Sequence, residues 1–146
     1  MNIMSDLETA RNNLRRKGLT LAIVKNGEVL FETRSHRISG FLNAVENLGG
    51  QLVGASLADK VAGKAVALLC VYAGISAVYA ETLSNKAKTV LEKKGIHTEW
   101  KELVDTILDL SRSDVCPFEK NAEKISDPKD AFKAFKALQE SLKCTE

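Results

Sequence analysis

The sequence predicts a three-layer α/β/α sandwich built around a five-stranded mixed sheet. Residues 51–100 alternate strand-like apolar runs with helical patterns, which is the order typical of parallel strands joined by helices. Before them, Asn26-Gly27 separates two β-rich runs and is a strong signal for an antiparallel hairpin. One antiparallel pair followed by parallel neighbours is therefore expected. We place the five strands near residues 19–25, 28–34, 51–57, 75–80 and 96–100.

The 146 residues are expected to form one domain, residues 1–146, with a helix at each end. Residues 1–17 repeat apolar side chains on one helical face, and Gly18 stands where a glycine would end that helix. Residues 126–146 contain Asp127-Pro128, a helix start signal, followed by a stripe of phenylalanine and leucine. No repeat or linker divides the chain.

One predicted helix, over about residues 59–72, has an unusual polarity. It is polar only in its first part, and from Ala65 to Val71 it is apolar on every side. A helix of this kind is covered on more than one side, so it lies either in the core or under a subunit interface. The second possibility raises a homodimer as a hypothesis.

Composition excludes several classes of protein. Hydrophobic residues make up 45% and charged residues 27%, which is typical of a folded globular domain. A net charge of +2 with interspersed signs gives no basic face for nucleic acid. The longest apolar run, Ala65–Ala73, is too short to span a membrane, and no signal-peptide core is present. Three cysteines without CxxC spacing favour a reduced, cytoplasmic protein.

The box Cys116-Pro117-Phe118-Glu119-Lys120 is the best candidate for chemistry. Proline favours the first helical position, so Cys116 would be the N-cap and Glu119 the third helical residue. The unpaired N–H groups and the helix dipole there favour a thiolate. Glu119 opposes that effect unless it reaches back to the N–H of the cap. Both are candidate catalytic residues, and the alternative is a half-buried cysteine with a structural role.

A second candidate cluster consists of Asp59, Lys60 and Lys64, at the start of the apolar helix just past a strand. Ligands in open α/β sheets bind at that edge. The two lysines are four residues apart and would share a helical face, while Asp59 would cap the helix. These are candidate ligand-binding residues; the alternative is an ordinary cap with two solvated lysines. Gly63-Lys64 lacks the preceding glycine and the following Ser or Thr of a phosphate loop.

Four phrases together resemble a small prokaryotic family of unknown function that is grouped with the cytidine-deaminase-like fold. The resemblance covers about residues 19–138, and it implies a deaminase-like arrangement of sheet and helices. The phrases are Val53-Gly54-Ala55, Ala58-Asp59-Lys60-Val61-Ala62-Gly63-Lys64-Ala65, Val78-Tyr79-Ala80 and Cys116-Pro117-Phe118-Glu119-Lys120.

The resemblance to true deaminases concerns the fold alone. Those enzymes carry His-x-Glu or Cys-x-Glu at one core helix and Pro-Cys-x-x-Cys at the next, because their zinc needs all three ligands. Here the first position reads Ala58-Asp59-Lys60-Val61, and the second reads Thr82-Leu83-Ser84-Asn85-Lys86-Ala87. We therefore predict no bound zinc and no other cofactor. Ser84, at the second position, is a further candidate ligand-binding residue.

Three functions remain open at this point. The first is a binding module that holds a nucleotide or another small anionic metabolite through Lys60 and Lys64. The second is a zinc-independent enzyme with Cys116 as nucleophile or redox thiol. The third is a structural protein whose apolar helix builds a dimer.

Overall fold

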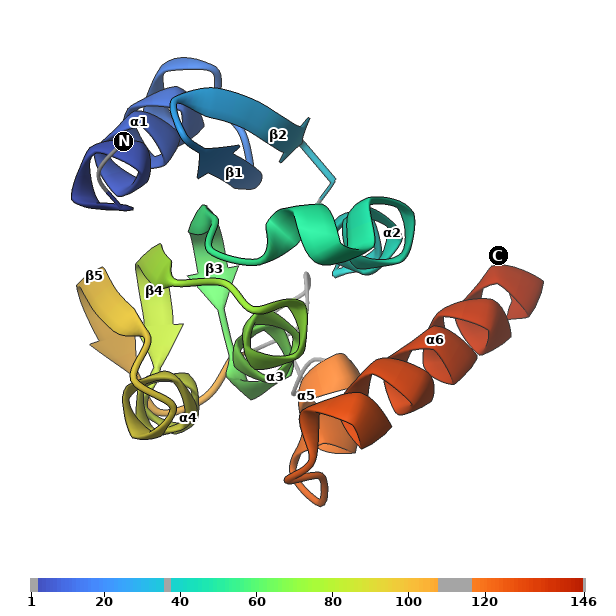
Figure 1. The fold of residues 1–146 in the computed structure, drawn as a ribbon. Helices are drawn as coiled ribbons and strands as arrows, with labels where there is room; N and C mark the ends of the chain where they lie inside the picture. The colour runs from blue at the N-terminus through green and yellow to red at the C-terminus, as the bar shows by residue number, and fades with distance from the viewer. Residues whose placement is uncertain (1–2, 36–37, 108–116, 146) are drawn as a thin grey trace.

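The structure is a computed structural model that describes residues 3–35, 38–107 and 117–145 (Figure 1). Its strands are β1 (Leu21–Lys25), β2 (Glu28–Thr33), β3 (Ser56–Ala62), β4 (Ala77–Ser84) and β5 (His97–Val104). They form one sheet in the order β2-β1-β3-β4-β5. β1 is antiparallel to β2 and β3, whereas β3, β4 and β5 run parallel. The predicted five-stranded mixed sheet is confirmed.

Helices cover both faces of this sheet, as the predicted fold class requires. Apolar residues of the first helix meet β1, β3 and β4 in one core, and the other helices share a larger core on the opposite face. The last two helices pack on the outside of α3 (Figure 1). The helices are α1 (Ile3–Arg16), α2 (Ser39–Leu48) with a 3-10 turn (Gly49–Leu52), α3 (Lys64–Ala73), α4 (Asn85–Lys93), α5 (Pro117–Ala122) and α6 (Pro128–Thr145).

The predicted hairpin turn is present, and α1 holds it. Asn26 and Gly27 both have positive φ, 52° and 77°, as a two-residue turn between antiparallel strands requires. The backbone N–H groups of these two residues donate to the buried carboxylate of Asp6, at 2.8 and 2.9 Å. One carboxylate thus fixes the start of α1 against the turn.

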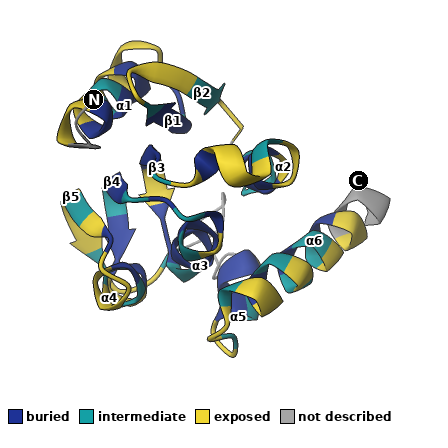
Figure 2. Cartoon of the chain, viewed as in Figure 1, coloured by how far each residue is buried: buried dark blue, intermediate teal, exposed yellow. Residues whose placement is uncertain are grey.

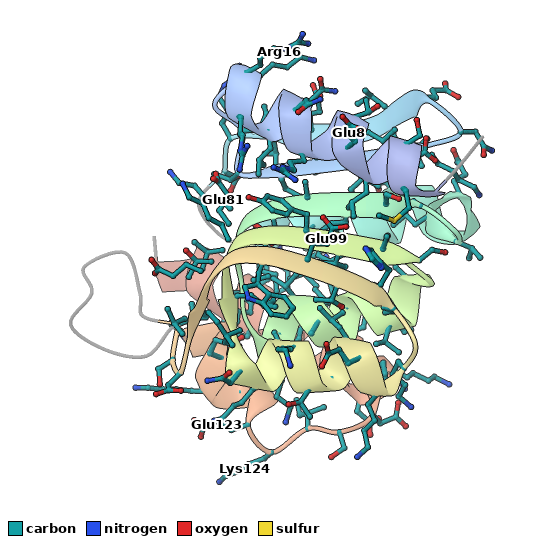
Figure 3. The ribbon with its side chains drawn as sticks, turned by 90° about the vertical axis from the view of Figure 1, so that its left-hand side faces the viewer. Glu8, Arg16, Glu81, Glu99, Glu123 and Lys124 are labelled. Atoms are coloured by element: carbon teal, nitrogen blue, oxygen red, sulfur yellow. The ribbon has the colours of Figure 1, made fainter. Side chains whose placement is uncertain are left out.

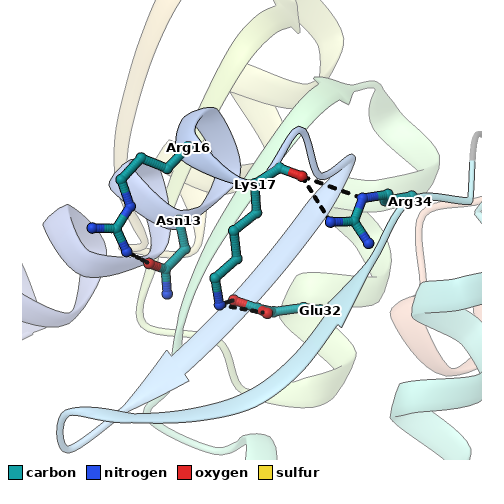
Figure 4. Close-up of polar contacts among 5 residues, drawn as sticks. All are labelled: Asn13, Arg16, Lys17, Glu32 and Arg34. Atoms are coloured by element: carbon teal, nitrogen blue, oxygen red, sulfur yellow. Dashed lines mark hydrogen bonds and ion pairs between the residues drawn. The ribbon is translucent and has the colours of Figure 1, made fainter.

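The other end of α1 is tied to β2 (Figure 4). The Lys17 ammonium pairs with both carboxylate oxygens of Glu32 at 3.1 and 3.2 Å. The guanidinium of Arg34 donates to the Lys17 carbonyl at 2.9 and 3.2 Å, and Arg16 donates to Asn13 at 3.5 Å. These contacts lie at the surface, so they orient α1 relative to β2 but add little to stability. The buried apolar residues between α1 and the sheet already stabilise this packing.

The predicted bounds of the three parallel strands are wrong, because each strand lies further along the chain. The expected 51–57, 75–80 and 96–100 are 56–62, 77–84 and 97–104 in the structure. The prediction ended the first strand at Leu57, because Ala58-Asp59 suggested a helix start, and it ended the other two before the polar residues Glu81 and Lys101. Those side chains lie at exposed or half-exposed positions of strands that continue past them.

The predicted start of the apolar helix is also wrong. α3 begins at Lys64, with Gly63 as its N-cap residue, so Asp59 and Lys60 belong to β3. Strand pairing decides this point, since Asp59 lies opposite Leu21 of β1 and Ala80 of β4. A segment with a neighbour on each side satisfies its backbone in the sheet, whatever its helix propensity.

The apolar surface of α3 is covered by the chain itself (Figure 2). The sheet lies on one side, and α5 and α6 lie on the other. Phe118 meets Phe135 edge to face at 6.0 Å between ring centroids, and Tyr72 stacks on Phe132 at 4.9 Å. The core explains the all-round apolar pattern, so α3 no longer argues for a homodimer. No helix among the described residues has the length and apolarity to cross a membrane.

Candidate functional site

Two helix N-termini lie side by side at the carboxyl edge of the sheet. β3 ends at Ala62 and α3 begins two residues later, while β4 ends at Ser84 and α4 follows at once. The register places Ala62 opposite Leu83, so the two junctions are neighbours. Each junction offers unpaired N–H groups that need an acceptor. The acceptor that each junction supplies to these N–H groups therefore defines the candidate site.

Glu119 fills the N-terminus of α3. Its carboxylate oxygens accept from the backbone N–H groups of Ala65 at 2.7 Å and Lys64 at 3.1 Å. Gly63 makes room for it, since a Cβ at that position would overlap the Glu119 carboxyl group. Burial raises the pKa of Glu119, against the lowering effect of the two N–H groups and of the Lys86 and Lys64 ammonium groups. The sequence raised a contact of Glu119 with its own helix cap as one alternative; in the structure its two carboxylate oxygens accept from the start of α3.

Ser84 caps α4 by itself. Its hydroxyl accepts from the Ala87 N–H at 3.1 Å, and the side chain is buried. Ser84 has the extended backbone typical of an N-cap residue. The hydroxyl oxygen is thus already used within the helix end, and Ser84 as a ligand-binding residue remains a prediction.

Asp59 points into the core beneath α3 and caps no helix. Its carboxyl group accepts from the Val61 N–H at 3.2 Å and is 8% exposed. Burial raises the pKa of Asp59 to about 8, against the lowering effect of the Val61 and Lys60 N–H groups. Burial, and then the nearby Asp59 carboxyl group, raise the pKa of the Cys70 thiol. These two groups form a buried pair on the sheet side of α3.

The two lysines of the predicted cluster do not share a helical face. Lys60 is exposed on β3, and its N–H donates to the Thr20 carbonyl at 2.9 Å. Lys64 is half-buried at the start of α3 and lies along the side of a groove. The structure therefore separates Lys60, Asp59 and Lys64 into three environments.

The groove lies between α3 and α4, and residues between α5 and α6 and at the start of α6 also line it. Its volume is about 580 Å³, within the range of small-molecule sites. Leu68, Val71 and Val90 give it an apolar floor. Its polar groups are mostly basic, because four lysines and one glutamate line it: Lys64, Lys86, Lys93, Lys94 and Glu123.

Glu123 meets two of these four lysines. Its carboxylate pairs with Lys86 at 3.6 Å, and its carbonyl accepts from the Lys64 ammonium at 3.4 Å. Within the part of the chain that the structure describes, Lys93 and Lys94 form no ion pair. The groove thus keeps an excess of positive charge beside an apolar surface. Nothing in the sequence placed the lysines of α4 beside Lys64.

Cys116 lies outside the described residues, so its predicted reactivity stays a prediction. The predicted helix after it is confirmed from Pro117 onward. The dependence of the alkylation rate on pH tests the thiol directly.

The residues at the two junctions do not fit a zinc ion. With α3 starting at Lys64, the first junction reads Gly63-Lys64-Ala65 and the second Ser84-Asn85-Lys86, and neither offers an imidazole or a thiolate. Among the described residues, no three His, Cys, Asp or Glu side chains gather at metal-binding distance. The absence of zinc is a prediction for metal analysis.

Comparisons with known proteins agree with the resemblance seen in the sequence. A family model described as "Domain of unknown function (DUF1893)" matches residues 9–139. The crystal structure of a DUF1893 family protein from Thermotoga maritima is similar, with a TM-score of 0.84 and 21% identity, over 94% of this chain and 92% of that one. A comparison with curated proteins gave no match.

Two deaminases are also among the similar structures. The dCMP deaminase from cyanophage S-TIM5 has a TM-score of 0.48 and 17% identity, over 66% of this chain and 94% of that one. A diaminohydroxyphosphoribosylaminopyrimidine deaminase/5-amino-6-(5-phosphoribosylamino)uracil reductase from Thermotoga maritima has a TM-score of 0.44 and 20% identity, over 80% of this chain and 40% of that one. At these TM-scores the two likenesses carry no argument about chemistry.

Proposed function

The chain belongs to the DUF1893 family, and from that premise we propose that it binds a small anionic metabolite, such as a nucleotide, in the groove between α3 and α4. The observation that carries the proposal is the composition of this groove. Four ammonium groups and one carboxylate surround an apolar floor within about 580 Å³. Such a surface attracts an anion and covers an attached apolar part.

The charges of the groove favour an anionic group near Lys93 and Lys94. Lys93 is the last residue of α4 and Lys94 follows it, while Lys64 and Lys86 lie at the opposite end, where α3 and α4 begin. Because Glu123 meets Lys64 and Lys86, the end near Lys93 and Lys94 keeps the larger excess of positive charge. A phosphate would bind there as a point charge to flexible ammonium groups.

The apolar floor favours a ligand that is more than a bare anion. Leu68 and Val71 of α3 and Val90 of α4 line the groove between the two basic ends. A base or another flat apolar group would remove this surface from water. The N–H groups at the start of α3 would take no part, since Glu119 already accepts from them.

Calorimetry and thermal unfolding with three probes test the proposal: orthophosphate, ribose 5-phosphate and adenosine monophosphate. We expect the nucleotide to stabilise the protein most, because a ligand that binds the folded state raises its stability. Replacing both Lys93 and Lys94 with Ala should weaken binding by about ten-fold or more.

Lys60→Ala is the matched control, because it removes an exposed lysine that lies on β3 and does not line the groove. It should bind the probes as the unmodified protein does. Failure of all three probes to bind, or equal weakening by Lys60→Ala, would contradict the proposal.

A further inference from the structure

The sheet has two edge strands, β2 and β5, and among the described residues neither has a strand on its outer side. β5 lies at the front of the view in Figure 3, where Glu99 is labelled on it. An edge strand presents unpaired N–H and C=O groups, which are a template for another strand. The charges and side chains along each edge strand decide which strand could pair with it.

The direction of the free backbone groups of β5 follows from its pairing with β4. The His97 N–H donates to the Ser76 carbonyl at 3.2 Å, so the backbone of His97 points toward β4. The offset between the two strands is the same from Ala77↔His97 to Ala80↔Trp100 and from Thr82↔Glu102 to Ser84↔Val104, with no pair at Lys101. Because these groups alternate along a strand, the N–H and C=O groups of Thr98, Trp100 and Glu102 point to the free edge.

We propose that β5 pairs antiparallel with β5 of a second copy of this chain, about a two-fold axis beside Trp100. In an antiparallel pair, the side chains of two directly opposed residues point to the same face of the sheet. In a symmetric pair of β5 strands, the two-fold axis is perpendicular to the sheet and therefore passes beside one residue, which lies opposite the same residue of the other copy. With the axis at Trp100, Thr98 faces Glu102 of the other copy. The outward backbone groups of these three residues then form about six hydrogen bonds.

Charge selects this axis over its neighbours. At Trp100, Glu99 of each copy faces Lys101 of the other, so two complementary pairs form. These are non-hydrogen-bonded positions, where opposed side chains come closest. An axis at Lys101 would set two ammonium groups against each other, and an axis at Glu99 would oppose two carboxylates. Glu99 already pairs with His97 on the same face at 2.7 Å, which holds its carboxylate there.

The apolar side chains of β5 point to the same conclusion. Trp100 is 36% exposed and Leu103 is 39% exposed. Trp100 lies on the α4 side of the sheet, where the Lys88 ammonium is 5.4 Å from the ring centroid. In the proposed dimer the two Trp100 rings meet at the axis, which removes the exposed part of each from water.

The other edge provides a contrast. β2 carries two charged residues, Glu28 and Glu32, and both are acidic. No antiparallel pairing of β2 with its own copy can therefore match opposite charges within the strand. Glu32 is also held by Lys17. Of the two edge strands, β5 can therefore match opposite charges with its own copy, and β2 cannot.

Sedimentation velocity and tryptophan fluorescence of the full chain test the dimer. Trp100 is the single tryptophan, so its emission reports on the axis alone. We expect a dimer that dissociates on dilution, with a red shift of the emission as Trp100 becomes exposed. Lys101→Glu creates two like-charge pairs and should raise the dissociation constant about ten-fold. The exchanged double variant Glu99→Lys with Lys101→Glu restores both pairs and should restore the dimer.

Glu28→Lys, a charge reversal on β2, is the matched control and should leave the dissociation constant unchanged. Amide hydrogen exchange provides a second measurement, because the N–H groups of Thr98, Trp100 and Glu102 should be protected only in the dimer. A chain that stays monomeric at every concentration overturns the proposal. So does a dimer that Lys101→Glu leaves intact, or one in which these three amides exchange freely.

Discussion

The two strand-to-helix junctions, β3–α3 and β4–α4, lie next to each other but satisfy their helix N-termini by different means. At β4–α4 the acceptor is local, since Ser84 caps the helix that follows it. At β3–α3 the acceptor comes from α5, where Glu119 reaches the N–H groups of Lys64 and Ala65. One junction depends on its own sequence, and the other depends on a segment more than fifty residues away.

This difference decides how each junction can be changed. A local cap can be removed with little effect on the rest of the fold, because only one helix end loses an acceptor. The Glu119 cap also holds α5 against α3, so its loss leaves two donors unpaired and loosens a contact between helices. Asp59, in β3 shortly before this junction, is a second buried carboxyl group beside Glu119 at this side of α3, whereas the β4–α4 junction has a hydroxyl.

The largest expected effect is a dependence of stability on pH that comes from Asp59, in β3 just before the β3–α3 junction. The folded protein keeps the Asp59 proton up to about pH 8, whereas an unfolded aspartate loses it near pH 4. Unfolding therefore releases a proton between these values, and the free energy of unfolding falls as the pH rises, by up to about 1.4 kcal/mol per pH unit. Asp59→Asn should flatten this fall in urea titrations from pH 4 to pH 8. A slope equal to that of the unmodified protein would show that Asp59 ionises normally.

Glu119→Ala should have the next largest effect on stability. It removes the acceptor of the buried Ala65 N–H and of the partly buried Lys64 N–H, so we expect it to lower the free energy of unfolding by about 2–4 kcal/mol. Urea unfolding measures the loss. Glu119→Gln keeps one acceptor oxygen and should lose less, which separates the hydrogen bonds from packing. Equal losses in both variants would contradict the cap.

Gly63→Ala should cost about 2 kcal/mol, because its methyl group would displace the Glu119 carboxyl group. The backbone of Gly63 is extended, with φ −104°, so the alanine itself brings no backbone strain. In a Glu119→Ala background the same change should cost much less, since the overlap is gone. Additive losses in this double-mutant cycle would show that the two residues act separately.

Ser84→Ala is the smallest expected effect, about 1 kcal/mol, which is typical of a lost N-cap. The loss should be the same in the presence and absence of Glu119→Ala, because the two caps serve different helices. It should also leave the pH dependence of stability unchanged. A strong coupling between the two substitutions would mean that the junctions are one cooperative unit.

The sequence determined much of the fold through local patterns. Asn26-Gly27 specified a hairpin turn because these residues accept positive φ, and Gly74 ends α3 for the same reason with φ 80°. Asp127-Pro128 marked a helix start that the structure confirms at Pro128. The family resemblance was also present in short motifs. Each of these signals depends on the conformational preferences of a few adjacent residues, so it can be recognised without knowledge of the fold.

The tertiary structure alone decided three further points. The segment 58–62 became strand because β4 pairs with it as far as Ala62 and β1 pairs with Ala58 and Asp59, although its composition also suits a helix. The apolar α3 is covered by α5 and α6 of its own chain, which an apolar pattern cannot distinguish from a subunit interface. Glu119 meets α3, and Lys64 shares a groove with Lys93, only after the chain folds. Local patterns specify what each segment prefers, but a contact between distant segments depends on pairing and packing that no single segment contains.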